Sequence, residues 1–163
     1  TVIHRPADTY LNRIVIDVGL DQGVLVDSAV ITPKGLIGKV ESVGANHSIV
    51  RLLSTQSDNN RVAVRIQLSP ALTAEAILQR YDANKGAFKL TLLDTNATIS
   101  IGNTVITSGL GGVFPSGLLV GTVSEIEQLP NSIAINVFVT PAADFYRFDY
   151  VLVIHRNIPE MTP

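Results

Sequence analysis

A glycine-rich stretch, TSGLGGVFPSGLLVG, spans Thr107 to Gly121. Loops of this composition bind phosphate when backbone N–H groups at the start of a helix are followed by a lysine and a hydroxyl residue. The spacing from Gly112 to Gly117 fits such a loop, but two leucines stand where those side chains are required. Gly109 and Gly111 begin a dinucleotide-binding pattern, but Phe114 occupies its third glycine position. The stretch is therefore not predicted to bind phosphate.

A serine in the same stretch raises the question of nucleophilic catalysis. His47, Asp82 and Ser108 follow one another in the order of the triad in chymotrypsin-like proteases. A chain with three histidines and many aspartates contains some such trio by chance. Ser108 also directly follows Val-Ile-Thr and lacks the Gly-Asp-Ser-Gly-Gly surroundings that shape an oxyanion hole. We predict no catalytic residue, and a trypsin-like serine hydrolase is kept as the alternative.

Other chemistry-bearing side chains are scattered. His4, His47 and His155 have none of the short spacings that bring metal ligands together, and the chain has no cysteine. Glu125 and Glu127 share one face of a predicted strand, where paired carboxylates could suggest glycoside chemistry, but alternating charges on a strand usually face solvent. Neither a metal nor a cofactor is predicted.

Composition and charge bound the class of protein. The 163 residues are 46% hydrophobic and 16% charged, with a net charge of −2, which predicts a folded chain. Lys and Arg occur singly, so no basic stripe favours nucleic acid as a partner. No apolar run approaches the ~20 residues that span a bilayer. Because the sequence begins at Thr1, we expect a fragment with further segments upstream.

The elements that position these residues are predicted to be short strands. Val and Ile far outnumber Leu, and β-branched side chains favour sheets. Residues 71–80 contain good helix formers, but the turn-like DANKG that follows favours a hairpin, so a strand is expected there too. The predicted strands are residues 13–17, 29–32, 36–43, 48–54, 62–67, 74–81, 87–93, 104–107, 118–128, 133–140 and 150–156.

An internal repeat relates the two halves. VITPKGLIGKVESV, from Val30, matches VITSGLGGVFPSGLLVGTVSEI, from Val105, with a glycine upstream of each copy, Gly23 and Gly102. The repeat predicts an all-β fold of two related, about six-stranded barrels. We expect the first barrel in residues 1–82, the second in 83–156 and a tail in 157–163, with approximate boundaries and strands that can cross between barrels. The barrel glycines are predicted to be Gly35, Gly38 and Gly121, with Gly35 matching Gly117 and Gly38 matching Gly121.

Four motifs together resemble one protein family. TSGLGGVFPSGL resembles the signature loop of MreC, the rod shape-determining protein family of the bacterial cell-elongation machinery. VIHRPADTYLNRIVIDVG from Val2, TPKGLIGKVESVG from Thr32 and PAADF from Pro141 resemble other parts of the same domain. The resemblance covers nearly the whole chain and implies two β-barrels in a chymotrypsin-like arrangement without its catalytic apparatus.

The resemblance also implies a function. Family members are non-enzymatic scaffolds on the extracytoplasmic face of the plasma membrane, anchored by a single transmembrane helix and preceded by a coiled coil. They self-associate as dimers and contact the elongation-specific penicillin-binding protein and MreD, with an indirect link to cytoskeletal MreB. The expected role is to organise peptidoglycan synthesis and cell shape. A two-barrel ligand-binding module remains a further alternative.

Two groups of residues are candidate contact sites. The glycine-rich loop can shape a barrel end with Phe114 as an apolar anchor, contact a partner, or do both. Four of the nine aromatic residues cluster after Pro141 and are expected either to fill a core or to mark a contact. The loop candidates are Ser108, Gly109, Gly111, Gly112, Phe114, Pro115 and Gly117, and the aromatic candidates are Phe145, Tyr146, Phe148 and Tyr150.

Overall fold

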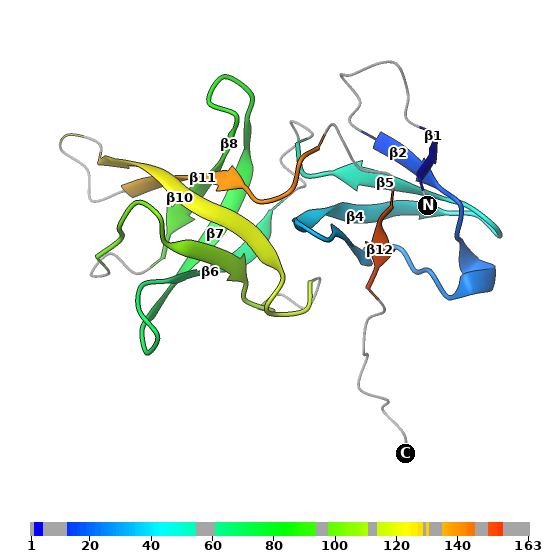
Figure 1. The fold of residues 1–163 in the computed structure, drawn as a ribbon, viewed down its shortest axis with the longest axis horizontal. Helices are drawn as coiled ribbons and strands as arrows, with labels where there is room; N and C mark the ends of the chain where they lie inside the picture. Colours follow the sequence, from blue (N-terminus) through cyan, green and yellow to red (C-terminus); the bar gives the residue numbers. More distant parts are fainter. Residues whose placement is uncertain are drawn as a thin grey trace.

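The chain folds into two β units that lie side by side (Figure 1). In this computed structural model, the structure describes residues 2–4, 13–54, 61–93, 98–110, 114–128, 130, 135–145 and 150–154. Within them the regular structure is strands, together with one 3₁₀ turn, η1 (Leu20–Gln22). The all-β class predicted from the sequence is confirmed.

The first unit, at the right of Figure 1, is a six-stranded antiparallel sheet in the order β1-β2-β5-β4-β3-β12. Its outermost strands come from opposite ends of the sequence, and both are very short. Among the described strands, no ladder joins these two edges. The six strands are β1 (Val2–His4), β2 (Arg13–Ile16), β5 (Ser48–Leu52), β4 (Gly35–Val43), β3 (Ala29–Thr32) and β12 (Leu152–Val153).

The second unit is a closed six-stranded barrel in the order β10-β11-β8-β7-β6-β9. Its strands are antiparallel throughout, and β9 pairs with β6 to complete the circle. The strands are β10 (Leu119–Gln128), β11 (Ile135–Pro141), β8 (Ala87–Leu92), β7 (Thr73–Asp82), β6 (Val62–Gln67) and β9 (Thr104–Thr107).

Alternation along the strands explains the barrel core. On β6, Val62, Val64 and Ile66 are buried, whereas the residues between them are half-exposed. The same period occurs on β7, so the two strands present one apolar face to the barrel interior. Residues 71–80, which were weighed as a helix, are confirmed as largely strand. The Asp82 carboxylate accepts backbone N–H groups of Asn84 and Lys85 at the next turn.

The internal repeat predicted from the sequence is present in the strand pairing. Val30 of β3 is paired with Gly38 of β4, and Val105 of β9 is paired with Gly121 of β10. Each pair lies next to a bulge. A second bulge follows Val40 where β4 meets β5, and another follows Val123 where β10 meets β11. Because bulges fix register and twist, the two copies share their geometry as well as their sequence.

The equivalence extends to all six strands. On one side of β4 lie β3 and then β12, and on the same side of β10 lie β9 and then β6. On the other side of β4 lie β5, β2 and β1, and on the other side of β10 lie β11, β8 and β7. The barrel then closes because β6 and β7 form one hairpin. The first unit therefore has the strand order of an opened barrel.

The structural equivalent of Gly102 in the first unit is Asp27 and not Gly23. The N–H of Asp27 donates to the carbonyl of Val40, as the N–H of Gly102 donates to that of Val123. Gly102 therefore corresponds to Asp27, which also has a positive φ, 68° against 96°. Gly23 instead ends η1, so the match of Gly23 with Gly102 in the predicted repeat was wrong.

The boundary expected between residues 82 and 83 is also wrong. The chain passes from the first sheet to the barrel between Leu52 and Val62, and β12 returns from the barrel to pair with β3. β6 forms a hairpin with β7 and also pairs with β9, about 40 residues later, and local patterning carries no information about the second pairing. β1 was not predicted, and the tail at 157–163 lies outside the described residues.

Candidate functional site

Thr107 holds together the two ends of the glycine-rich loop between β9 and β10. Its backbone N–H donates to the carbonyl of Leu118 at 2.8 Å, and its own carbonyl accepts the N–H of Gly117 at 2.9 Å. Its hydroxyl donates to the carbonyl of Pro115 at 2.6 Å and accepts the N–H of Leu118 at 2.9 Å. The side chain is buried, so these bonds replace water and fix the base of the loop.

The predicted loop residues have structural contacts. Ser108 is only 7% exposed, and its N–H donates to the carbonyl of Ala63 on β6 at 3.1 Å. Its hydroxyl oxygen accepts the N–H of Leu110 at 3.3 Å, which is a turn interaction. Gly109 and Gly117 have φ of 81° and 90°, the left-handed region that disfavours side chains. Of the other candidates, Gly111 and Gly112 lie outside the described residues.

Phe114 is 6% exposed and belongs to the core. Leu110, on the other side of the loop, is 58% exposed. The loop therefore places one large apolar side chain inward and another outward. The described part of the loop is thus a structural element that leaves the apolar side chain of Leu110 exposed.

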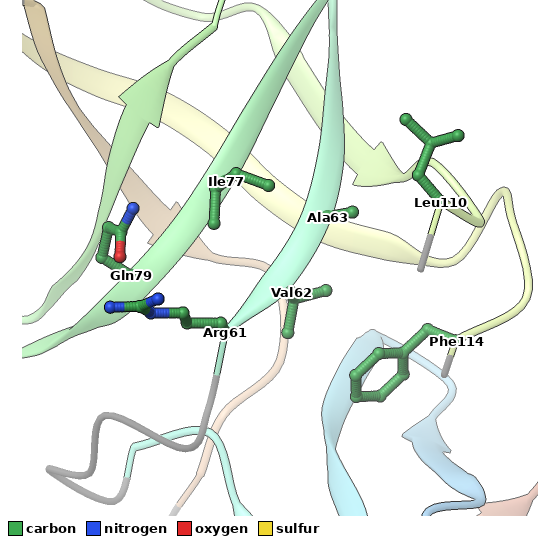
Figure 2. Close-up of a pocket in the computed structure, with 7 residues that line it drawn as sticks. All are labelled: Arg61, Val62, Ala63, Ile77, Gln79, Leu110 and Phe114. Carbon is green, nitrogen blue, oxygen red and sulfur yellow. The ribbon is translucent and has the colours of Figure 1, made fainter. Parts of the chain in front are cut away.

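A pocket of about 350 Å³ lies between the loop and the β6–β7 hairpin (Figure 2). Ala63 and Ile77 are directly paired across these strands and are half-exposed on their outer face. Figure 2 shows Leu110 and Phe114 on one side of the pocket and Arg61 with Gln79 at the other. The lining residues are Arg61, Val62, Ala63, Ile77, Gln79, Leu110 and Phe114.

Charge is confined to one end of the pocket. Arg61 is the only ionisable residue in the lining, and Gln79 beside it is neutral. Farther along the same strands, Arg65 and Glu75 neutralise each other in a 2.9 Å ion pair. The structure gives Arg61 no ion pair with another of the described residues. The pocket thus has an apolar end and a cationic end.

Gly38 and Gly121 lie where two backbones approach each other closely. A Cβ added at Gly38 would collide with the carbonyl oxygen of Arg51, and one added at Gly121 would collide with that of Thr140. These are matching positions on the next strand of each unit. Both glycines therefore permit the same inter-strand approach.

Gly35 lies at the junction of the two units. Its added Cβ would lie 2.9 Å from the carbonyl oxygen of Leu119 and 3.1 Å from the Cβ of Ala142. Both neighbours belong to the barrel side of the molecule, so a side chain at Gly35 would push the units apart.

The aromatic candidates separate into different environments. Phe145 is buried and makes edge-to-face contacts with Tyr81 and Phe88, with ring centroids 6.0 Å and 5.9 Å away. Tyr150 is 70% exposed. Tyr146 and Phe148 lie outside the described residues. The structure therefore places Phe145 in the core and leaves Tyr150 on the surface.

The trio weighed for catalysis is dispersed. His47 lies in the β4–β5 turn of the first unit, whereas Asp82 and Ser108 belong to the barrel. Ser108 is bonded to Ala63, which pairs with Ile77 on β7, and Asp82 lies five residues farther along β7, or about 16 Å at the usual strand rise. These three side chains form no triad.

The described residues contain neither a metal-binding group nor a membrane-spanning helix. No three of their His, Asp or Glu side chains are grouped so that they could hold a metal ion. Among these residues there is also no helix with the length and apolar character needed to cross a membrane.

Comparison with known proteins assigns the family. The family model of the rod shape-determining protein MreC, barrel core, matches residues 2–155. The chain belongs to the MreC family. The cell shape-determining protein MreC of Bacillus subtilis is 37% identical over 164 residues, which cover 98% of this chain and 57% of that protein. The chain thus spans little more than half the length of such curated relatives.

Solved MreC structures share the two-unit fold. MreC of Listeria monocytogenes is 36% identical, with a TM-score of 0.88 over 95% of this chain and 73% of that one. A major periplasmic domain of the cell shape-determining filament MreC is 30% identical, with a TM-score of 0.78 over 88% and 85%. MreC of Helicobacter pylori, solved in complex with the penicillin-binding protein PBP2, is 18% identical, with a TM-score of 0.60 over 83% and 80%, a likeness in fold alone.

Three residues of the MreC site were not singled out in the sequence. Thr107 was noted only as part of Val-Ile-Thr, although the recurrence of that threonine in both copies was an available signal. Ala63 and Arg61 were unremarked because the pocket depends on the pairing of β6 with β7 and on the β9–β10 loop folding back. The pocket is a tertiary feature that no local pattern encodes.

Proposed function

We propose that this chain is a non-enzymatic scaffold domain of the bacterial cell-elongation machinery, which organises peptidoglycan synthesis and cell shape through protein contacts. The observation that carries the proposal is the match to the MreC barrel core across residues 2–155, with a two-unit fold superimposable on that of solved MreC. Its curated relatives are cell shape-determining proteins. A fold with a rigid frame and an exposed apolar loop suits a protein-binding role.

We propose a penicillin-binding protein as a direct partner. The Helicobacter pylori MreC structure is a complex with PBP2, which supports this class of partner for a chain of the same fold. Self-association of the full-length protein, contact with MreD and an indirect link to MreB complete the proposed assembly. An extracytoplasmic location is supported by the periplasmic origin of the MreC domain solved at high resolution.

The scaffold proposal is tested by a chimera in Bacillus subtilis. The region of its MreC that aligns with this chain is replaced by the 163 residues, and cell width is measured after depletion of the native protein. Rod-shaped cells of near-normal width are expected, because the exchanged domains share their fold. A chimera carrying Gly121→Val serves as a misfolding control. Round cells despite normal membrane levels of the chimera would contradict the proposal.

The serine hydrolase alternative has its own test. Ser108 is buried, bonded within its turn and remote from His47 and Asp82, so a fluorophosphonate probe is expected to leave the native chain unlabelled. Trypsin treated in parallel controls for probe reactivity. Stoichiometric labelling that disappears in Ser108→Ala would replace the scaffold proposal by the enzyme.

A further inference from the structure

The pocket between the β6–β7 hairpin and the glycine-rich loop combines three features of a peptide-docking groove. Its floor is Ala63 and Ile77, its wall is Leu110 and Phe114, and its cationic end is Arg61. Peptide grooves bind by accepting apolar side chains and fix direction with a few polar groups. We call these five residues the loop groove.

The loop groove is preorganised. Its floor lies on β6 and β7, which are joined along six residue pairs. Its wall lies in the glycine-rich loop, whose two ends are joined by the hydrogen bonds of the Thr107 hydroxyl. Ser108 additionally ties the loop to Ala63. Because these groups are already ordered, binding there loses little conformational entropy.

A small side chain creates the hollow. Ala63 stands opposite Ile77 on the outer face of β6, whereas the outward residue two positions later is Arg65. A longer side chain at Ala63 would fill the space in front of Leu110. The hollow therefore depends on the small side chain of Ala63, and a larger residue at this position tests it directly.

Charge decides what kind of segment fits. Arg61 is exposed at the end of the loop groove, and the structure gives it no carboxylate partner among the described residues. A carboxylate placed there would gain an ion pair and two-point hydrogen bonding, whereas a cation would be repelled. The remaining lining is apolar apart from Gln79, so the rest of the occupant must be apolar.

We propose that the loop groove docks a segment of a partner protein that presents a large apolar side chain beside an aspartate or glutamate. The apolar side chain lies over Ala63 against Leu110, and the carboxylate pairs with Arg61. This inference deepens the proposed scaffold function by assigning one contact surface and the chemistry of its partner.

Peptide titration tests the groove directly. The end-blocked heptapeptide GSFDLSG is added to the ¹⁵N-labelled chain, with GSFNLSG, GSFKLSG and GSSDSSG as matched probes. GSFDLSG is expected to shift the amide signals of Ala63, Ile77 and Leu110 and to bind about three- to fivefold more tightly than GSFNLSG. GSSDSSG should not shift them. Absence of groove shifts with GSFDLSG up to about 1 mM would overturn the proposal.

Two groove variants and one matched control locate the binding. Ala63→Leu fills the hollow and should abolish the shifts, while Ala71→Leu, on the exposed β6–β7 turn, makes the same chemical change elsewhere and should leave them intact. Arg61→Glu should reverse the preference, so that GSFKLSG binds more tightly than GSFDLSG. Thermal melts establish that each variant is folded. Unchanged charge preference in folded Arg61→Glu would refute the assigned orientation and the proposal with it.

A crosslinking experiment separates this inference from the scaffold function. A photoreactive benzoylphenylalanine replaces Leu110 or Leu72, which are similarly exposed at 58% and 62%, in the Bacillus subtilis chimera. Crosslinks to the elongation-specific penicillin-binding protein are expected from position 110 and not from 72. Rod-shaped cells with crosslinks from neither position would retain the scaffold and overturn the docking site. Crosslinks only to a second copy of the chain would overturn it as well.

Discussion

The first sheet and the barrel contain equivalent strands in equivalent order, yet among the described strands the ladders close only the barrel. In the barrel, the closing strands β6 and β7 form one hairpin with six residue pairs. In the first unit, the equivalent places are taken by β12 and β1, which contribute two and three residues from opposite ends of the described chain. The repeated part of each unit is therefore its centre, and the described strands differ mainly at the outer positions.

The difference teaches where the fold is specified. A hairpin closes a short loop, whereas pairing the two ends would close a loop of nearly the entire chain, which costs more entropy and has few pairs to offset it. Both units retain a glycine, Gly38 or Gly121, at which two strands approach closely beside a β-bulge; we call these positions the crossing glycines. Gly38 is paired with Val30, and Gly121 is paired with Val105. The four central strands, β2-β5-β4-β3 in the first unit and β8-β11-β10-β9 in the barrel, thus form the common structural core of the repeat.

Substitution of the crossing glycines should have the largest effect. Gly38→Val and Gly121→Val are each expected to lower the free energy of unfolding by about 3 kcal/mol, because Cβ would collide with a carbonyl oxygen that is held in a ladder. Valine ordinarily favours strands, so propensity alone predicts the opposite sign. Urea denaturation measures both. Stabilities equal to the parent would show that the crossings are not tight.

The second-largest difference in stability between the two units should come from the equivalent threonines, Thr32 and Thr107. Thr107 bridges its loop with bonds of 2.6 and 2.9 Å, whereas Thr32 makes bonds of 3.4 and 3.2 Å to Gly35 and Lys34. The near-isosteric Thr107→Val is expected to cost about 2 kcal/mol and Thr32→Val about 1 kcal/mol, because each leaves buried or half-buried backbone groups unpaired. Urea melts of the two variants give the comparison. Equal losses would mean that the shorter hydrogen bonds of Thr107 give its loop no more stability than those of Thr32 give the first unit.

Much of this architecture was predictable from local pattern. The strand at Val62–Gln67 alternates with period two, and the repeat at Val30 and Val105 predicts the equivalence of Gly38 with Gly121. These features are local because periodicity and bulge glycines are written in a few adjacent residues. The burial of Phe114 agrees with one of the two roles expected for the loop, an apolar anchor at a barrel end.

What local pattern does not contain is the partner of each strand. The pairing of β6 with β9, which closes the barrel, and the return of β12 to β3 are both long-range. The loop groove shares this origin, since Arg61 and Leu110 meet only through it. The equivalence of Asp27 with Gly102 was not predicted for another reason: the sequence does not show that a residue other than glycine has a positive φ.

A charge network distinguishes the outer face of the first sheet. Glu41 accepts hydrogen bonds from Arg13 at 2.5 Å and Arg51 at 2.7 Å. The hydrogen bond from Arg13, followed by that from Arg51, lowers the pKa of Glu41 below its ordinary value, against the opposing effect of burial. The charges on the barrel are arranged differently, with one cation, Lys85, bound to Glu125 at 2.8 Å and interacting with the charges of Glu127 and Asp82.

The network should make the first sheet sensitive to acid. A lowered pKa in the folded state means that Glu41 contributes stability above its unfolded pKa of about 4.3, and that this contribution disappears as the pH falls through the folded value. Glu41→Gln should cost about 1 kcal/mol near pH 7, discounted for partial exposure, and almost nothing at strongly acidic pH. Melting temperatures across pH compare the variant with the parent. A pH-independent difference would exclude the carboxylate charge as its source.

The smallest effect should come from exchanging Asp27 and Gly102, which occupy the same turn in the two units. Asp27→Gly relieves a left-handed aspartate but increases the freedom of the unfolded chain and removes a 3.8 Å contact with Lys39, so we expect a change within about 0.5 kcal/mol. Gly102→Asp has room for its side chain but imposes left-handed strain, and should cost about 1 kcal/mol. Urea denaturation of both variants measures the asymmetry. If Gly102→Asp were neutral, the two turns would tolerate either residue, and the repeat would fix backbone shape without fixing residue type.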